Sequence, residues 1–334
     1  MEFAQILEWV IKAFVIILFL TAGFAYTTLY ERRVLARIQA RVGPNRTGPF
    51  GLLQPVADGI KLIFKEELIP ASADKLIFIL APVVTVIPAL IVTAVVPWGS
   101  SIKIFGREVF LYLADVNVAV LYIMAVTSIS VYGISLAGWS SNNKYATMGG
   151  LRSIAQMISY ELSLGVAMLG PVLIAGSMSL VDIVEAQSKI WFVILQPLAF
   201  LIYFASSLAE INRAPFDMPE AEQELTAGYH TEYSGMKFAL FFMAEYIKMI
   251  AIAMICATLF FGGYQGPYIG LHPWLGPLYF LIKIALILFI FIWIRATWPR
   301  FRYDRLMAFG WKILFPLSLL NILITAGVVL WMGG

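Results

Sequence analysis

The sequence predicts an all-α polytopic membrane protein with eight transmembrane helices and one interfacial amphipathic helix. Of its 334 residues, 61 % are hydrophobic and only 13 % are charged, and the mean hydropathy is +0.86. Soluble domains carry about 25 % charged residues, whereas apolar runs of about 20 residues are long enough to span a bilayer as helices. We therefore expect residues 1–334 to form a single integral membrane domain.

Eight apolar runs are the candidate transmembrane helices. They lie at residues 9–30, 76–97, 115–138, 153–175, 190–210, 238–261, 279–297 and 309–332. Pro82, Pro88, Pro171 and Pro197 fall within these runs. A proline in a transmembrane helix is tolerated where neighbouring groups satisfy the freed carbonyls, so kinks are expected at these positions.

The basic residues of the connecting loops predict the orientation in the membrane. The loops at 31–74, 139–152, 211–237 and 298–308 hold 14 Lys and Arg, whereas the opposite set, with both termini, holds 3. Short cytoplasmic loops carry the excess of basic residues. We therefore expect these four loops to face the cytoplasm and both termini to face the periplasm.

The first loop contains a second kind of helix, in the stretch "GLLQPVADGIKLIFKEE" at residues 51–67. Its apolar residues recur every three or four positions, which places them on one helix face: Leu52, Leu53, Val56, Ile60, Ile63 and Phe64. The segment is too short and too charged to span a bilayer. It predicts an amphipathic helix lying in the membrane interface, with a short re-entrant segment as the alternative.

Three charged residues lie deep inside predicted spans. Glu161 is about nine residues, or roughly 13 Å, from the cytoplasmic start of its helix and has no obvious partner on that helix. Glu245 and Lys248 are three residues apart and share a helix face. Charges at such depth usually face a bundle interior or an aqueous path. The alternative is a structural Glu245–Lys248 pair with no other role.

The loop "EINRAPFDMPEAEQELTAGYHTEYSG", residues 210–235, contains six acidic residues and Arg213 as its one Lys or Arg. With the buried acids it forms a series of carboxylates leading from the cytoplasmic surface to the middle of the membrane. The outer halves of the spans hold no matching set. The sequence therefore predicts half of an ion pathway, which other chains must complete.

Several classes of protein are excluded by composition. The one cysteine, Cys256, lies in an apolar run, which excludes disulfides and cysteine-bound iron–sulfur clusters. His230 and His272 are the only histidines and lie in different loops, so neither a haem nor a metal site is expected. A net charge of +3 is too small to predict a nucleic-acid partner, and phosphate-binding glycine loops and nucleophile elbows are absent.

Four long stretches resemble one family. They are "YERRVLARIQARVGPNRTGPFGLLQPVADGIKLIFKEE", "GWSSNNKYATMGGLRSIAQMISYE", "EINRAPFDMPEAEQELTAGYHTEYSGMKFALFFMAEY" and "WIRATWPRFRYDRLMAFGWK". In this order they are similar to the H-subunit family of bacterial respiratory complex I, NADH:quinone oxidoreductase, whose mitochondrial counterpart is ND-one. The resemblance covers nearly all of the chain.

The resemblance implies a membrane protein that joins the hydrophilic arm to the proton-pumping arm. Its expected partners are the hydrophilic-arm subunits carrying the terminal iron–sulfur cluster, small membrane subunits, antiporter-like subunits and lipid. Its substrate would be ubiquinone or menaquinone, and the chain itself would bind no flavin, haem or iron–sulfur cluster. The implied location is the bacterial inner membrane, or the mitochondrial inner membrane if the chain is organellar.

The resemblance also implies two sets of site residues. The quinone tunnel would be lined or shaped by Arg32, Gln39, Arg213, Arg295, Arg300 and Arg302. The path coupling quinone reduction to proton movement would contain Asp58, Glu161, Glu210, Glu220, Glu222, Glu224 and Glu245.

Three alternatives stay open from the sequence. The arginines could serve only to anchor the cytoplasmic side. The chain could be a purely structural anchor for a soluble redox module. It could also be the homologous component of an ion-translocating hydrogenase or another electron-input complex. A secondary transporter acting alone is disfavoured, because no inverted repeat is visible.

Overall fold

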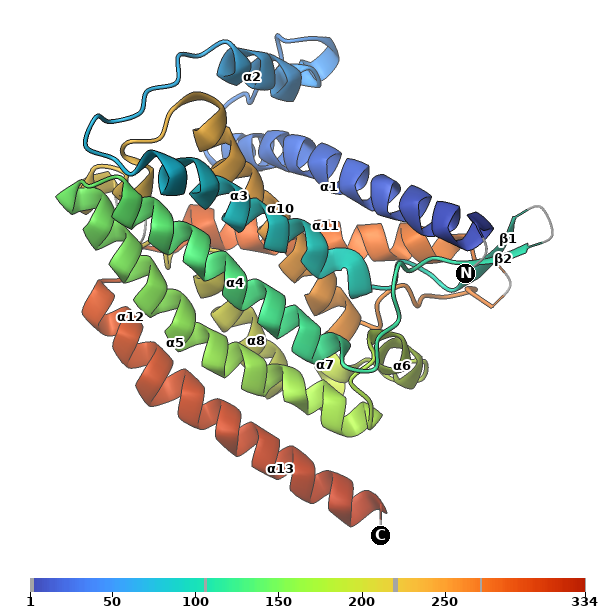
Figure 1. Cartoon of the computed structure of the whole chain (residues 1–334). Helices are drawn as coiled ribbons and strands as arrows, with labels where there is room; N and C mark the ends of the chain where they lie inside the picture. The colour runs from blue at the N-terminus through green and yellow to red at the C-terminus, as the bar shows by residue number, and fades with distance from the viewer. Residues whose placement is uncertain (1–2, 105–106, 219–221, 271, 334) are drawn as a thin grey trace.

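The computed structural model describes residues 3–104, 107–218, 222–270 and 272–333. It is built almost entirely from helices (Figure 1). The helices are α1 (Phe3–Ile38), α2 (Gln54–Ile63), α3 (Lys75–Ile91), α4 (Ala119–Ser140), α5 (Lys144–Ala175), α6 (Leu180–Ala186), α7 (Phe192–Leu195), α8 (Pro197–Glu210), α9 (Glu222–Leu225), α10 (Gly235–Phe260), α11 (Leu275–Thr297), α12 (Tyr303–Phe309) and α13 (Phe315–Gly333). Single turns of 3₁₀ helix lie at Pro49–Gly51, Val92–Val95 and Gly228–His230, and a π-helical turn at Gly310–Leu314 joins α12 to α13.

The predicted fold class is confirmed. Within the described residues, seven helices are long and apolar enough to cross a membrane, and α8 is a shorter apolar helix. Together they correspond to the eight predicted spans. Several helices extend beyond the apolar runs: α1 continues to residue 38 instead of 30, and α5 begins at residue 144 instead of 153. Arginine is a good helix former, so the backbone stays helical where the side chains become charged.

The predicted span at 190–210 is divided. The backbone leaves the helical region at Gln196 (φ −133°, ψ 62°), between α7 and α8. The next residue is Pro197, which disfavours a helical conformation in the residue before it. By contrast, Pro82 and Pro88 lie within α3 and Pro171 lies within α5, where the helices continue.

The predicted amphipathic helix is present as α2, shorter than the 51–67 stretch. It contains no buried residue, and Val56, Ile60 and Ile63 on its apolar face are each more than half exposed. In Figure 1 this helix lies outside the main bundle. Its helical structure is confirmed, and its place in the membrane interface stays a prediction.

A short β-hairpin is an element that the sequence did not predict. Strands β1 (Ser101–Ile104) and β2 (Arg107–Phe110) pair antiparallel, with Ser101 opposite Phe110. The hairpin connects α3 to α4 at the end of the bundle where the N-terminus lies (Figure 1).

Close helix packing depends on small residues at the contacts. A Cβ on Gly133 of α4 would lie 2.1 Å from Thr85 Oγ1 of α3, and one on Gly149 of α5 would lie 2.7 Å from Gly228 Cα. Small residues at helix contacts let backbones approach closely in membrane bundles. Helix α10 is central, and its side chains from Met249 to Phe260 are all buried.

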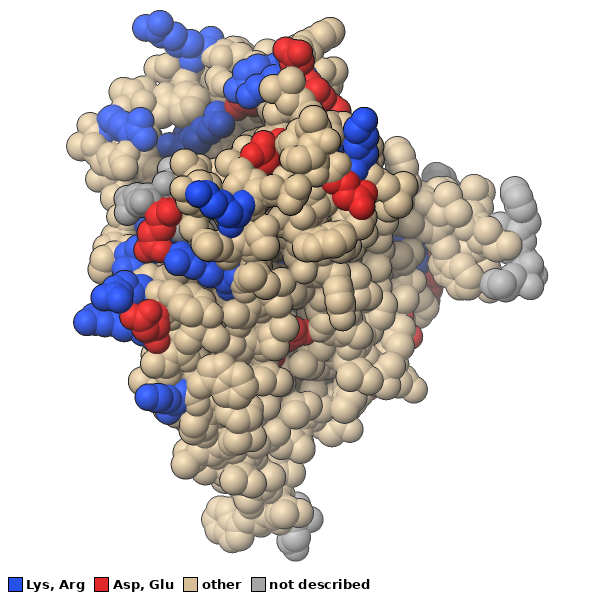
Figure 2. Space-filling model, turned by 60° about the vertical axis from the view of Figure 1, so that its left-hand side comes forward, with Lys and Arg blue, Asp and Glu red and all other residues tan. Residues whose placement is uncertain are grey.

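The four basic loops meet at one end of the bundle, which we call the α2 end. Lys237 Nζ lies 2.5 Å from Glu67 Oε2, Asn143 Nδ2 donates to Glu232 Oε1 at 2.6 Å, and the amide of Phe301 donates to the carbonyl of Pro215 at 3.2 Å. These contacts join all four segments. Figure 2 shows the charged side chains gathered on this part of the surface, with large neutral areas elsewhere.

Candidate functional site

A buried group of charged side chains, the arginine cluster, lies where α1, α10 and α11 meet the segment after α8. Its members are Glu31, Arg213, Glu245, Tyr246 and Arg295. Arg213 pairs with Glu31 at 3.3 Å and with Glu245, and Arg295 pairs with Glu31. Tyr246 donates to Glu31 Oε2 at 2.7 Å. The cluster therefore ties four segments together through two carboxylates and two guanidinium groups.

Arg213 is positioned by the backbone that follows α8. Asn212 adopts a positive φ of 58°, a conformation that asparagine tolerates better than most residues. This turn directs Arg213 into the bundle, where its side chain is about nine-tenths buried. The guanidinium also lies over the ring of Tyr246, 4.4 Å from the centroid, an arrangement that favours a cation.

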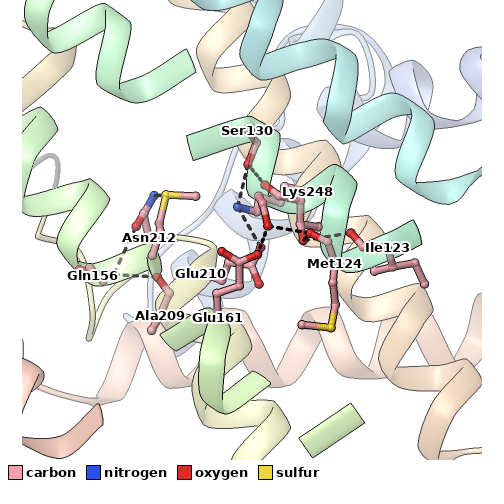
Figure 3. Close-up of polar contacts among 12 residues, drawn as sticks. Ile123, Met124, Ser130, Gln156, Glu161, Ala209, Glu210, Asn212 and Lys248 are labelled. Carbon is pink, nitrogen blue, oxygen red and sulfur yellow. Dashed lines mark hydrogen bonds and ion pairs between the residues drawn. The ribbon is translucent and has the colours of Figure 1, made fainter. Parts of the chain in front are cut away.

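A second group, the lysine cluster, lies between α4, α5, α8 and α10 (Figure 3). It contains Ser128, Ser130, Glu161, Glu210 and Lys248. Lys248 Nζ lies 3.1 Å from Glu210 Oε1 and donates to Ser130 Oγ at 3.3 Å. Ser128 donates to Glu161 Oε1. Figure 3 shows Glu161 and Glu210 side by side near the lysine, so two acids and one base share this site.

A cavity of about 40 Å³ connects the two clusters. Glu210, Lys248 and Ser130 line it, and so does Glu245 of the arginine cluster. Most of the lining is apolar, and these charged and hydroxyl side chains are its polar part. A cavity of this size has room for ordered water, since one water requires roughly 10–15 Å³. The second oxygen of Glu210 is buried and has no hydrogen-bond partner within the described residues. This oxygen therefore remains available to accept a proton or a further hydrogen bond.

The structure contradicts one alternative left open by the sequence. Glu245 and Lys248 share a helix face, but they do not satisfy one another. Glu245 pairs with Arg213, and Lys248 pairs with Glu210. Glu161, which lacked a partner on its own helix, receives its hydrogen bond from the neighbouring α4. Partners on neighbouring segments therefore lie closer to each charge than the residue three positions away.

The other residues of the predicted tunnel lie nearer the surface of the α2 end. Arg32 joins α1 to α2 through a 2.7 Å contact with Asp58. Gln39 accepts a 2.7 Å hydrogen bond from Arg41. Arg300 donates to the backbone of Asp217. Arg302 is separate from all of these, because it is largely exposed and pairs with Asp304.

The acidic loop is only partly described. Glu224 pairs with Arg152 of α5 at 2.6 Å and is half exposed, so it lies outside the two buried clusters. Glu220 and the side chain of Glu222 lie outside the described residues. Of the seven predicted path residues, the structure brings together Glu161, Glu210 and Glu245 and places Asp58 and Glu224 at the surface.

The end of the same loop is held by aromatic packing. Tyr233 stacks on Phe78 of α3, with ring centroids 4.0 Å apart, and His230 lies against Tyr229 and Phe241. Burial lowers the pKa of His230 to about 3. This histidine is therefore neutral at physiological pH and adds no charge to the acidic loop.

Glu31 is the residue that sequence reasoning missed. It directly precedes Arg32 in "YERR" and is 4 % exposed. The first predicted span ends at residue 30, which assigns Glu31 to the loop. An acid next to two arginines at the end of a long apolar run is the signal that could have found it.

Comparison with known proteins identifies the family. The model of the NADH dehydrogenase family matches residues 11–326. The chain belongs to this family. The resemblance seen in the four sequence stretches is thereby confirmed.

Related NADH dehydrogenase family members are similar over nearly their whole length. The H subunit of NADH-quinone oxidoreductase from Protochlamydia amoebophila is 54 % identical over 302 residues, covering 90 % of this chain and 91 % of the relative. The protein of the same name from Thermomicrobium roseum is 50 % identical over 341 residues, covering 99 % and 98 %. An H subunit of NADH-quinone oxidoreductase from Geobacter metallireducens is 54 % identical over 307 residues, covering 92 % of each chain.

Proposed function

We propose that this chain is the membrane subunit of a proton-translocating NADH:quinone oxidoreductase. In that role it forms the quinone-access tunnel and links quinone reduction to proton movement through buried carboxylates. The observation that carries the proposal is the cavity shared by Glu210, Lys248 and Glu245. It is lined by Glu245 of the arginine cluster and by Glu210 and Lys248 of the lysine cluster.

The arrangement supports coupling by electrostatics. Each cluster balances carboxylates against cations at short distance, and closely spaced acids share their protons, so that their titration depends on nearby charge. A quinone that takes up electrons and protons near the arginine cluster changes that charge. Arg213 and Arg295 would respond first, Glu245 next, and the Glu210–Lys248 pair through the cavity.

The proposed partners and substrate follow from the name of the related proteins, and the proposed orientation follows from the excess of basic residues in one set of loops. The chain would supply no redox centre of its own and would receive electrons at the α2 end from hydrophilic subunits. Small membrane subunits and antiporter-like subunits would continue the acidic path. The α2 end would face the cytoplasm, both termini the periplasm, and the substrate would be ubiquinone or menaquinone.

Replacing Glu161 with glutamine tests the proton path. An amide oxygen still accepts the hydrogen bond from Ser128, but the amide cannot release or take up a proton. We expect normal assembly with quinone-coupled turnover or proton pumping reduced roughly tenfold or more. Glu185→Gln, which changes an exposed acid at the other end of the bundle, is the matched control.

A double variant tests the Glu210–Lys248 pair. Glu210→Gln alone leaves a buried lysine with a neutral partner, whereas Glu210→Gln with Lys248→Met removes both charges. We expect the double variant to assemble better than Glu210→Gln but to pump no better. Normal turnover and pumping in both Glu161→Gln and Glu210→Gln would rule out the proton path and favour the alternative that the chain is only a structural anchor.

Purification from native membranes distinguishes the remaining alternative. The tagged chain is isolated gently, its associated proteins are identified, and NADH:quinone reductase activity is measured. We expect a flavin- and iron–sulfur-containing assembly. Recovery with a nickel–iron hydrogenase would keep the acidic path and remove NADH from the function.

A further inference from the structure

An open pocket of about 1050 Å³ lies beside the last turns of α1, separate from both charge clusters. The chain reverses just after this helix: Ala40 has a positive φ of 52°, and the amide of Arg41 donates to the carbonyl of Ala36 at 2.8 Å. Gly43 then passes so close to α1 that an added Cβ would lie 3.3 Å from Arg33 Cα. The helix and the returning loop therefore form two walls of one pocket.

Three arginines line this pocket: Arg33, Arg37 and Arg41. They are spaced four residues apart, so Arg33 and Arg37 share one face of α1. None of the three pairs with a carboxylate in the part of the chain that the structure describes, and no acid lines the pocket. Six other arginines do pair with carboxylates: Arg32, Arg152, Arg213, Arg295, Arg300 and Arg302.

The rest of the pocket is mainly apolar. Val34 and Ile38 lie on α1, and Phe50, which is 80 % exposed, lies at the far end of the loop. Phe289 contributes from α11, eight residues before that helix ends at Thr297. At 1.5 Å per residue this is about 12 Å along the helix axis. The pocket thus extends from a basic rim at the α2 end toward the apolar part of a membrane-spanning helix.

We propose that this pocket binds an anionic phospholipid. Arginine guanidinium groups match phosphate oxygens in charge and in bidentate geometry, and basic pockets between membrane helices on the cytoplasmic side bind anionic headgroups. The phosphate lies among Arg33, Arg37 and Arg41, and an acyl chain follows Val34, Ile38 and Phe289 into the bilayer. The rest of the chain leaves α1 largely uncovered, since only 6 % of its most apolar window is buried, so lipid can reach the pocket from this side.

Charge and shape favour this ligand over two others. A quinone carries no phosphate and leaves three guanidinium groups uncompensated. An acidic surface of a neighbouring protein would compensate the arginines but would not reach Phe289 within the span. A phospholipid can compensate the arginines with its phosphate and reach Phe289 with an acyl chain, because the pocket has its charged part at the rim and its apolar part deeper in the span.

The test compares lipid retention in matched triple variants. The tagged full chain, with the subunits that accompany it, is purified in mild detergent, and bound lipids are quantified by native mass spectrometry. The pocket variant is Arg33→Gln, Arg37→Gln, Arg41→Gln. The control variant is Arg46→Gln, Lys65→Gln, Arg305→Gln, which changes three exposed basic residues outside the pocket. Delipidated samples are then titrated with phosphatidylglycerol and with phosphatidylcholine.

We expect the unmodified chain and the control variant to retain phosphatidylglycerol in preference to phosphatidylcholine. The pocket variant should bind phosphatidylglycerol about tenfold or more weakly. Equal retention by both variants would overturn the proposal. Loss of a hydrophilic subunit from the pocket variant, with lipid retention unchanged, would also overturn it and assign the arginines to a protein surface.

Two further variants keep the test decisive if the pocket variant fails to assemble. Arg33→Lys, Arg37→Lys, Arg41→Lys retains the charge but loses the bidentate geometry, and we expect intermediate binding of phosphatidylglycerol. Phe289→Ala leaves the arginines intact and removes apolar contact area deep in the pocket, so we expect weaker retention of the same lipid. Unchanged retention in both variants would overturn the proposal.

Discussion

At the residue scale, the buried charges are defined by partners far apart in the sequence. Glu31 forms ion pairs with Arg213 and Arg295 and accepts a hydrogen bond from Tyr246. These three residues lie 182 or more positions away along the chain. Placing an isolated ion in a low-dielectric interior has a high free-energy cost, so such ions occur in pairs or networks. The residues of the arginine cluster are therefore interdependent, and removing one leaves its partners with less compensating charge.

Glu31→Gln tests this dependence. The amide keeps the size of the side chain but removes the charge that the buried Arg213 and the partly exposed Arg295 share. We expect the free energy of unfolding to fall by about 3–5 kcal/mol, measured by denaturation of the purified chain in detergent. Glu8→Gln, which breaks the more exposed pair with Lys12, should change it by about 1 kcal/mol or less. Equal effects of the two changes would contradict the interpretation.

His230 predicts an acid sensitivity of the fold. The unfolded histidine takes up a proton near pH 6.5, whereas the buried side chain, with its lowered pKa of about 3, does so only in strong acid. Between these values the unfolded state binds more protons, so stability falls as pH falls, by up to about 1.4 kcal/mol per pH unit. His230→Asn should weaken this dependence. Melting temperatures at pH 4–7 measure it, and parallel profiles would contradict the assignment.

At the element scale, helix contacts depend on where a Cβ is missing. The α3–α4 contact closes over Gly133, whose missing Cβ leaves space that Thr85 occupies. The break at Gln196 instead depends on the proline that follows it. In each case a single residue sets the geometry between two helices, namely the distance between α3 and α4 and the break between α7 and α8. Helix propensity predicts only that these segments are helical.

Gly133→Ala tests the α3–α4 contact. The new methyl group would lie 2.1 Å from Thr85 Oγ1 and 2.8 Å from Thr85 N, so the helices must separate. We expect a loss of about 1–3 kcal/mol in the free energy of unfolding. Gly59→Ala on α2, where nothing lies within 4 Å, should leave stability unchanged or raise it by up to about 1 kcal/mol. A neutral Gly133→Ala would show that the contact can relax.

At the scale of the whole molecule, charge is distributed unevenly between the two ends of the bundle. The segments with most of the loop lysines and arginines meet at the α2 end, and the hairpin, the start of α1 and the end of α13 lie at the other (Figure 1). This asymmetry is the basis of the predicted orientation.

Cysteine labelling tests the orientation. Cys256 is fully buried, so engineered cysteines at exposed lysines report on each end. A membrane-impermeant maleimide should label Lys189→Cys in right-side-out vesicles and Lys65→Cys only in inverted ones. The reverse pattern would place the α2 end in the periplasm.

Sequence alone determined the fold class, the eight spans apart from the break at Gln196, the amphipathic helix, and the presence of charges within the bundle at 161, 245 and 248. These depend on local quantities, namely the length of apolar runs, their periodicity and the cost of isolated charges. The tertiary structure decided which charges pair, that Glu31 belongs to the site, and that a cavity connects Glu245 to Glu210 and Lys248. Those outcomes depend on distances between helices, because electrostatic pairing acts over a few ångströms in space and is independent of separation along the chain.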